Sequence, residues 1–137
     1  MIVPNHTPNL LVTDDDSAFR GVVRDALVSR GFRVTEAENG EEALEILAGT
    51  EVHVALVDLH MPRMTGLDLM RHLVRRPDSP PCVLMSAALD DQVRREAERM
   101  RAYRVLSKPI RLGQIREVVS AALADVYGWR PAPHPGR

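Results

Sequence analysis

The sequence is poor in several features, and each shortage argues against a class of protein. Its 137 residues contain one cysteine, Cys82, so no internal disulfide can form, which fits a cytoplasmic location. No apolar run approaches the roughly 20 residues that cross a bilayer, and we expect no membrane insertion. The first residues also lack the basic start and apolar core of a secretory signal.

An excess of basic residues is also missing. The 18 lysines and arginines are matched by 19 aspartates and glutamates, and the formal net charge is -1. Since nucleic-acid affinity comes mostly from neutralising phosphates, we expect no direct nucleic-acid binding. The remaining composition, 45% hydrophobic and 27% charged, is that of a soluble globular protein, and the length suits one domain.

Short apolar segments alternate with amphipathic ones along the chain. The apolar segments predict strands at 9–13, 33–37, 54–57, 82–85 and 104–106. Helical patterns are found at 41–48, 66–75, 90–100 and 112–126, after a first helix that Ser17 should cap and Gly31 should end. The apolar faces of the first and third helices include Val22 and Val74, whereas the face over 90–100 is thin.

Strands that alternate with helices predict an α/β fold with a parallel sheet and helices on both faces. The first, third and fourth strands are the most hydrophobic and should be central, while 33–37 is polar enough for an edge. With five strands we expect the flavodoxin-like doubly wound order 2-1-3-4-5. The domain should cover residues 9–126, with a loose lead-in over 1–8 and a proline-rich tail over 127–137.

Polar side chains follow four of the predicted strands. Asp14 and Asp15 follow the first, Asp58 the third, Ser86 the fourth and Lys108 the fifth. Each is ordinary when taken alone, because carboxylates cap helices, serines occupy turns and lysines are solvated. The carboxyl ends of parallel strands meet at one edge, where α/β proteins keep their sites. The set therefore predicts one crevice holding three acids, a hydroxyl and an ammonium.

This combination suits phosphoryl chemistry. Clustered carboxylates without a cysteine fit a hard cation such as Mg2+, which keeps open positions for phosphate oxygens. A carboxylate is also a nucleophile toward phosphorus and forms an aspartyl phosphate. Lys108 would bind a phosphoryl group as a point charge, and Ser86 would donate a hydrogen bond to it.

Residues 9–126 resemble the receiver domain of two-component response regulators. The motifs that carry the resemblance are LLVTDDDSAFR, LVDLHMPRMTGLDLMR, VLMSA and LSKPI, in that order. The resemblance implies that Asp58 is the phosphoacceptor and that Asp15 binds Mg2+ directly, with Asp14 acting through water. It also implies a role for the backbone carbonyl of His60 as a metal ligand. Further matches are Ser86, Lys108 and Pro109, a proline that is commonly preceded by a cis peptide bond in this family.

The resemblance also implies partners and a mode of action. A sensor histidine kinase or a phosphotransfer protein would supply the phosphoryl group, and a downstream effector protein would read the switch. Such a domain is not an enzyme toward other substrates, since it catalyses only its own phosphorylation and dephosphorylation. The responding face would consist of the fourth helix, the fifth strand and the fifth helix, and this face allows a homodimer.

Two positions depart from the family pattern. Val105 occupies the site of the usual switch tyrosine or phenylalanine, and Arg101 stands where a glycine often follows the fourth helix. Tyr103 lies two residues before Val105 and, on a strand, would face the same side. Either Tyr103 replaces the aromatic switch or the switch is absent, and we favour absence. The alternative function is therefore a receiver-like module that binds proteins without phosphorylation. An aspartyl-phosphate phosphatase is disfavoured because position 60 is histidine rather than a second acid.

Overall fold

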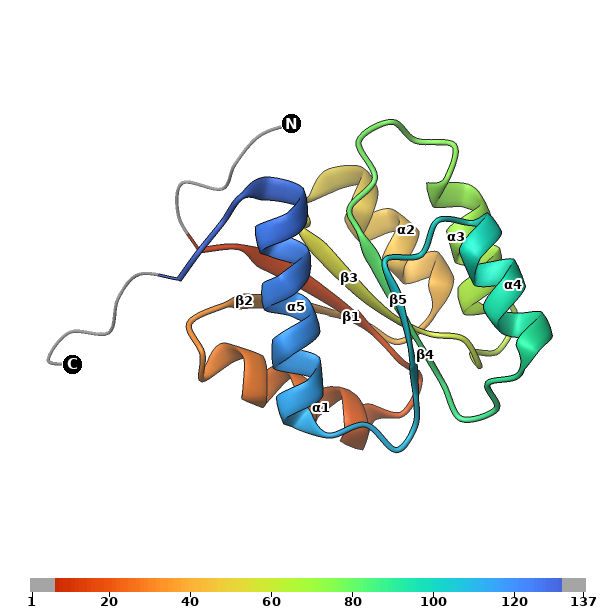
Figure 1. Cartoon of the computed structure of the whole chain (residues 1–137), viewed down its shortest axis with the longest axis horizontal. Coiled ribbons are helices and arrows are strands. Elements are labelled where there is room, and N and C mark those ends of the chain that lie inside the picture. The colour runs from red at the N-terminus through yellow and green to blue at the C-terminus, as the bar shows by residue number, and fades with distance from the viewer. Residues whose placement is uncertain (1–6, 132–137) are drawn as a thin grey trace, which may run out of the picture.

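Five parallel strands form one sheet in the order β2-β1-β3-β4-β5 (Figure 1). The computed structural model describes residues 7–131. The strands are β1 (Asn9–Thr13), β2 (Arg33–Ala37), β3 (Val54–Asp58), β4 (Cys82–Ser86) and β5 (Arg104–Ser107). The helices are α1 (Ser17–Val28), α2 (Gly40–Gly49), α3 (Gly66–Leu73), α4 (Asp91–Arg99) and α5 (Leu112–Tyr127). The predicted fold and strand order are confirmed.

Hydrophobicity sets each strand's place in the sheet. Every residue of β1, β3 and β4 is buried, and these strands occupy the centre. The polar strands β2 and β5 form the edges, where an exposed side chain costs little. The register sets Leu11 of β1 beside Thr35 of β2 and Ala55 of β3, so neighbouring strands end at nearly the same level.

Alternate residues of each strand face opposite layers of helices. Leu10 and Val12 of β1 pack in one apolar cluster with Val23 of α1 and Val119 of α5. Leu11, between them, packs in a second cluster with residues of α2, α3 and α4, including Ala97. Two helices therefore cover one face of the sheet and three cover the other.

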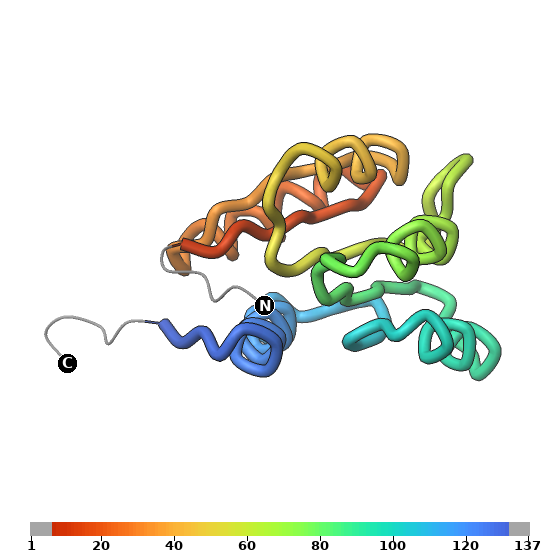
Figure 2. The backbone as a smooth tube through the Cα atoms, turned by 90° about the horizontal axis from the view of Figure 1, so that it is seen from above, coloured from red at the N-terminus to blue at the C-terminus, as the bar shows by residue number. Residues whose placement is uncertain are grey.

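The helix α4 is the most thinly anchored of the five. Ala97 is its one buried residue, which agrees with the thin apolar stripe of the sequence. Figures 1 and 2 both place α3 and α4 side by side, and Arg71 of α3 lies 3.8 Å from Glu96 of α4. Because α4 buries little apolar surface against the sheet, only a small free energy is needed to shift its position.

Some local predictions were wrong. The cap of α1 is Asp16 rather than Ser17, since the carboxylate of Asp16 accepts hydrogen bonds from the N–H groups of Ala18 and Phe19. Val22 and Val74, expected to face inward, are 52% and 48% exposed. Val23 and Leu27 face the sheet in α1, and α3 ends at Leu73, one residue before Val74.

The last helix is anchored by aromatic contacts at its end. The hydroxyl of Tyr127 donates to the carbonyl of His53, and the ring of Trp129 packs 5.6 Å from that of Phe32. Residues 1–6 of the predicted lead-in and 132–137 of the predicted tail lie outside the described residues. Within residues 7–131, no helix is both long and apolar enough to cross a membrane.

Arg101, just after α4, has a left-handed backbone conformation that a glycine would adopt without strain. Its φ is 60°, its N–H donates to the carbonyl of Glu98, and the next N–H, of Ala102, donates to Ala97. This is the Schellman pattern that ends many helices, and α1 ends in the same way with Gly31 at φ 92°.

We expect Arg101→Gly to stabilise the protein by about 1 kcal/mol, because a side chain in the left-handed region costs roughly that amount. The free energy of unfolding from urea titrations measures the effect. Arg95→Gly, in the middle of α4, is the matched control and should destabilise by about 1 kcal/mol. A loss of stability in Arg101→Gly would contradict the assigned strain.

Candidate functional site

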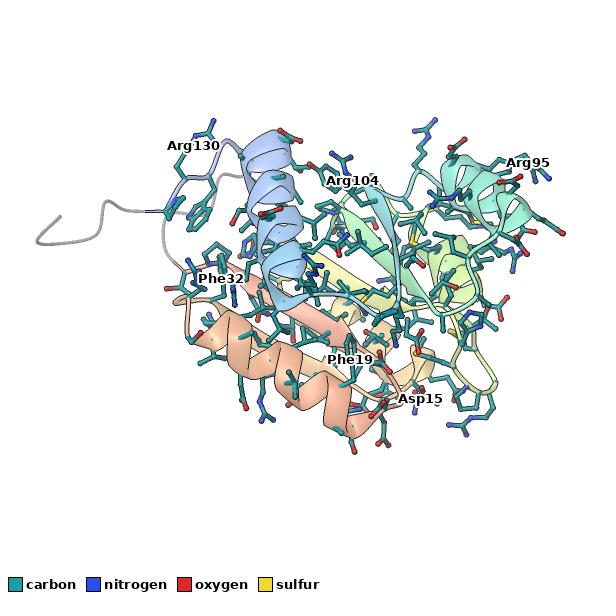
Figure 3. All side chains as sticks on the ribbon, turned by 60° about the horizontal axis from the view of Figure 1, so that its bottom comes forward. Asp15, Phe19, Phe32, Arg95, Arg104 and Arg130 are labelled. Carbon is teal, nitrogen blue, oxygen red and sulfur yellow. The ribbon has the colours of Figure 1, made fainter. Side chains whose placement is uncertain are left out.

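Three carboxylates converge at the carboxyl edge of the sheet. Asp14 and Asp15 follow β1, and Asp58 is the last residue of the adjacent strand β3. One oxygen from each lies within 4.8 Å of the others. Asp14 is fully buried, Asp58 is 4% exposed and Asp15 is open to solvent. Figure 3 shows Asp15 near Phe19, at the start of α1.

Lys108 is the cation of the site and the one lysine of the chain. Its Nζ donates to Oδ2 of Asp14 at 2.9 Å and lies 3.7 Å from Oδ1 of Asp58. It also lies 4.5 Å from the centre of the Phe19 ring, and this cation–π contact further stabilises the ammonium in its position. The other oxygen of Asp14 accepts the N–H of Asp16 at 2.9 Å, so both oxygens of Asp14 are engaged.

The electrostatics follow from burial and like charge. Burial raises the pKa of Asp58 above its ordinary value, and the nearby negative charge of Asp14 raises it further. For Lys108, burial opposes the charge, but the hydrogen bond to Asp14 and the attraction of the carboxylates outweigh it and raise the pKa. The ammonium therefore stays charged beside the acids.

Ser86 and His60 complete the site from the next strand and loop. Ser86 ends β4 and is fully buried, and its Oγ accepts the N–H of Ala88 at 3.0 Å. The Nε2 atom of His60 lies 2.9 Å from the same Oγ. The backbone N–H of His60 donates to Oδ1 of Asp58 at 3.3 Å. The peptide bond that joins Lys108 to Pro109 is cis.

Three further residues support the site, and their roles there were not predicted from the sequence. Arg20 donates from Nη1 to the carbonyl of Asp14 and pairs with Glu36, which fixes the backbone at the end of β1. Phe19 lies under Lys108. A Cβ on Gly66 would lie 2.6 Å from the carbonyl oxygen of Asp58, so α3 can begin this close to the site only at a glycine. Only the position of Gly66 in the DLHMPRMTG run hinted at such a role.

The expectation that Tyr103 shares a side with Val105 was wrong. Tyr103 precedes the first residue of β5, so strand alternation does not extend to it. Its ring packs in the cluster beneath α5, and its hydroxyl donates to Asp125 of that helix. Val105 packs in the opposite cluster, together with Ala97 of α4.

The donor set of the acidic cluster fits a hard divalent cation. All three side chains offer carboxylate oxygens, which are the ligands that Mg2+ prefers. Asp15 is exposed and therefore accessible to an arriving ion, whereas the oxygens of Asp14 already have protein donors.

Comparison with known proteins agrees with this geometry. Residues 10–120 match the family model described as response regulator receiver domain. The chain belongs to this family. The DNA-binding transcriptional regulator NtrC of Escherichia coli (strain K12) is 35% identical over 113 residues, which make up 82% of this chain and 24% of NtrC. This chain therefore spans about a quarter of the length of that relative. Receiver domains of this family act in phosphorelay signalling.

Two solved structures extend the comparison. A response regulator receiver protein from Pseudomonas putida is 27% identical with a TM-score of 0.81, over 86% of this chain and 99% of that one. A response regulator protein from Burkholderia pseudomallei is also 27% identical, with a TM-score of 0.76 over 88% of this chain and 71% of that one. The latter structure contains a phosphorylated aspartic acid, a calcium ion and citrate.

The raised pKa of Asp58 predicts a pH-dependent cost to the fold. An acid whose pKa is higher in the folded state destabilises that state above the folded pKa and has no effect below its ordinary value of 3.8. Without divalent cations, Asp58→Asn should therefore be more stable than wild type at pH 7. The difference should shrink as the pH falls toward 3.8.

Urea unfolding at several pH values, with a chelator present, measures this difference. Asp68→Asn is the contrasting control, because hydrogen bonds from Thr65 lower the pKa of Asp68 and its charge therefore stabilises the fold at pH 7. An Asp58→Asn variant that is less stable than wild type at pH 7 would contradict the assigned electrostatics.

The close approach at Gly66 predicts a steric cost. The added Cβ of Gly66→Ala meets two backbone atoms, the Asp58 oxygen at 2.6 Å and the Leu59 Cα at 2.8 Å, which have little room to move. We expect a loss of about 1–3 kcal/mol in the free energy of unfolding. Gly49→Ala, at an open helical position, should be neutral or stabilising. Equal effects at the two glycines would exclude the steric explanation.

Proposed function

We propose that the domain accepts a phosphoryl group on Asp58 from a sensor histidine kinase or a phosphotransfer protein. A carboxylate oxygen of Asp58 attacks phosphorus, the bond to the donor breaks, and the donor keeps the electron pair. The observation that carries the proposal is the position of Asp58, which lies 3.7 Å from the Lys108 ammonium and beside an acidic pair. This arrangement provides a nucleophile and the charges that hold a phosphoryl group in place.

Mg2+ is the cofactor that the carboxylates would hold. Asp15 would bind it directly and Asp14 through water, since both oxygens of Asp14 already accept hydrogen bonds. Asp58 and the backbone carbonyl of His60 would complete the protein's share of ligands. The ion supplies positive charge against the phosphoryl oxygens. The calcium ion and phosphorylated aspartic acid in the Burkholderia pseudomallei protein support this assignment.

Ser86 and Lys108 would contact the phosphoryl group on the side opposite the Mg2+ ion. Lys108 attracts a phosphoryl oxygen as a point charge, and the hydroxyl of Ser86 donates to another. The domain acts on no other substrate in this proposal, because it catalyses only the gain and loss of its own phosphoryl group. A phosphatase would need a second acid at position 60, where this chain has His60.

The output face would be α4, β5 and α5, and its reader a downstream effector protein in the cytoplasm. The weak anchoring of α4 supports this choice, and the same face allows a homodimer. Val105 stands where an aromatic switch would be, and Tyr103 is held on the α5 side by Asp125. The absence of the aromatic switch also favours the second function, protein binding without phosphorylation. That function predicts equal effector affinity for wild type and Asp58→Asn.

Incubation with a small phosphodonor and Mg2+ tests the proposal. Intact mass spectrometry should show wild type gaining one phosphoryl group and Asp58→Asn gaining none. Asp15→Asn should react about a hundredfold more slowly, the scale of losing one charge-stabilising group. Asp16→Asn removes the same charge one residue away and should react like wild type, because asparagine caps a helix equally well.

Two results would reject the assignment. One is a wild-type protein that gains no mass, and the other is an Asp58→Asn variant that gains as much as wild type. Equal rates for the Asp15 and Asp16 variants would instead remove Asp15 from the metal site and leave Asp58 as acceptor.

A further inference from the structure

We propose that the imidazole of His60 is a latch that holds the Ser86 hydroxyl in the resting domain and must release it when Asp58 is phosphorylated. This proposal rests on the proposed function of Asp58. It assigns His60 a positioning role through its side chain, separate from the role of its backbone carbonyl.

The hydrogen-bond geometry of Ser86 carries the argument. A serine hydroxyl has one proton to donate and two lone pairs that accept. The N–H of Ala88 occupies one lone pair at 3.0 Å. Ser86 is fully buried, and among the described residues the hydrogen-bond partner left for its proton is Nε2 of His60 at 2.9 Å.

The alternative direction of this hydrogen bond is costly. If Nε2 carried the proton and donated to Oγ, the oxygen would accept twice and the hydroxyl proton would be buried without an acceptor. A buried donor without a partner costs more than a net hydrogen bond contributes. Ser86 therefore donates to Nε2, and the neutral ring carries its own proton on Nδ1.

Phosphorylation creates a competitor for the same proton. A phosphoryl oxygen on Asp58 attracts the Ser86 hydroxyl more strongly than a neutral imidazole does, because the acceptor is charged. One proton cannot serve both acceptors, so Ser86 can no longer donate to Nε2, and the resting hydrogen bond, with the ring proton on Nδ1, is lost. The free energy of this hydrogen bond therefore opposes the change to the phosphorylated conformation and stabilises the resting state when the phosphoryl group is absent.

The latch is set in a rigid frame. The backbone of His60 is tied to Asp58 by its N–H, and the carbonyl of Ser86 accepts the N–H of Lys108 at 2.8 Å. The hydroxyl and the ring are therefore the parts free to rotate, while the strand ends stay in place. Breaking the latch releases a side chain without disturbing the sheet.

The ring tautomer tests the latch without any phosphoryl group. Nitrogen chemical shifts of His60, measured by NMR at a pH where the ring is neutral, should show the proton on Nδ1 in wild type. Ser86→Ala should shift the Nε2 signal, while His72, exposed on α3, should not change. A wild-type ring with its proton on Nε2 would overturn the proposal.

The cost of the latch is measured by titration with beryllofluoride, a phosphoryl mimic, in the presence of Mg2+. His60→Phe keeps a ring but has no acceptor, and it should bind beryllofluoride about fivefold more tightly, the equivalent of one hydrogen bond. His60→Gln, whose amide oxygen can accept from Ser86, should fall between His60→Phe and wild type. In a Ser86→Ala background, His60→Phe should have no effect.

The outcomes separate this proposal from the proposed function. If wild type binds no beryllofluoride, the phosphoacceptor assignment fails, and the ring tautomer still decides the latch. If beryllofluoride binds but His60→Phe weakens it, or acts equally in the Ser86→Ala background, the latch is wrong and the phosphoacceptor assignment stands.

Discussion

The site is built on the attraction between one ammonium and a group of carboxylates that repel one another. Two unit charges about 5 Å apart repel by roughly 3 kcal/mol at the effective dielectric of a partly buried site. Asp14, Asp15 and Asp58 lie within such distances, and Lys108 opposes their repulsion at 2.9 Å from Asp14. The negative charge that remains in excess makes the site suited to a cation, and together with burial, the larger cause, the charge of Asp14 raises the pKa of Asp58.

The topology determines which charges meet. The order β1-β3-β4-β5 puts the acids on adjacent strands, but it leaves Lys108 beyond β4. Its side chain must therefore reach past the ends of β4 and β3, where Ser86 and Asp58 lie, to contact Asp14. The ring of Phe19 lies beneath its ammonium. In the proposed function, a phosphoryl group on Asp58 would enter between the lysine and the serine, so both would respond to the same event.

The sequence predicted the sheet and the members of the site because both depend on short patterns. Hydrophobicity separated the central strands from the edges, and the residues that follow the strands identified Asp58, Ser86 and Lys108. Contacts that depend on rotamers and loop paths could not be predicted in this way. The bond between His60 and Ser86, the turn of Tyr103 toward Asp125, and the backbone contact at Gly66 all require coordinates.

With valine at position 105, the proposed function needs a route from the phosphoryl group to the output face that uses no aromatic residue there, and Ser86 offers a short one. Ser86 and Asp90, the N-cap of α4, are separated by three residues, and the N–H of the middle one, Ala88, donates to the Ser86 hydroxyl. In the proposed function the Ser86 side chain turns toward a phosphoryl oxygen, and because its Oγ accepts this N–H, the turn would be felt by the loop. The loop leads directly into a helix with one buried residue, Ala97, and a strained end at Arg101. A helix held so weakly needs little energy to move, and in the proposed function the serine would displace it without an aromatic residue at position 105.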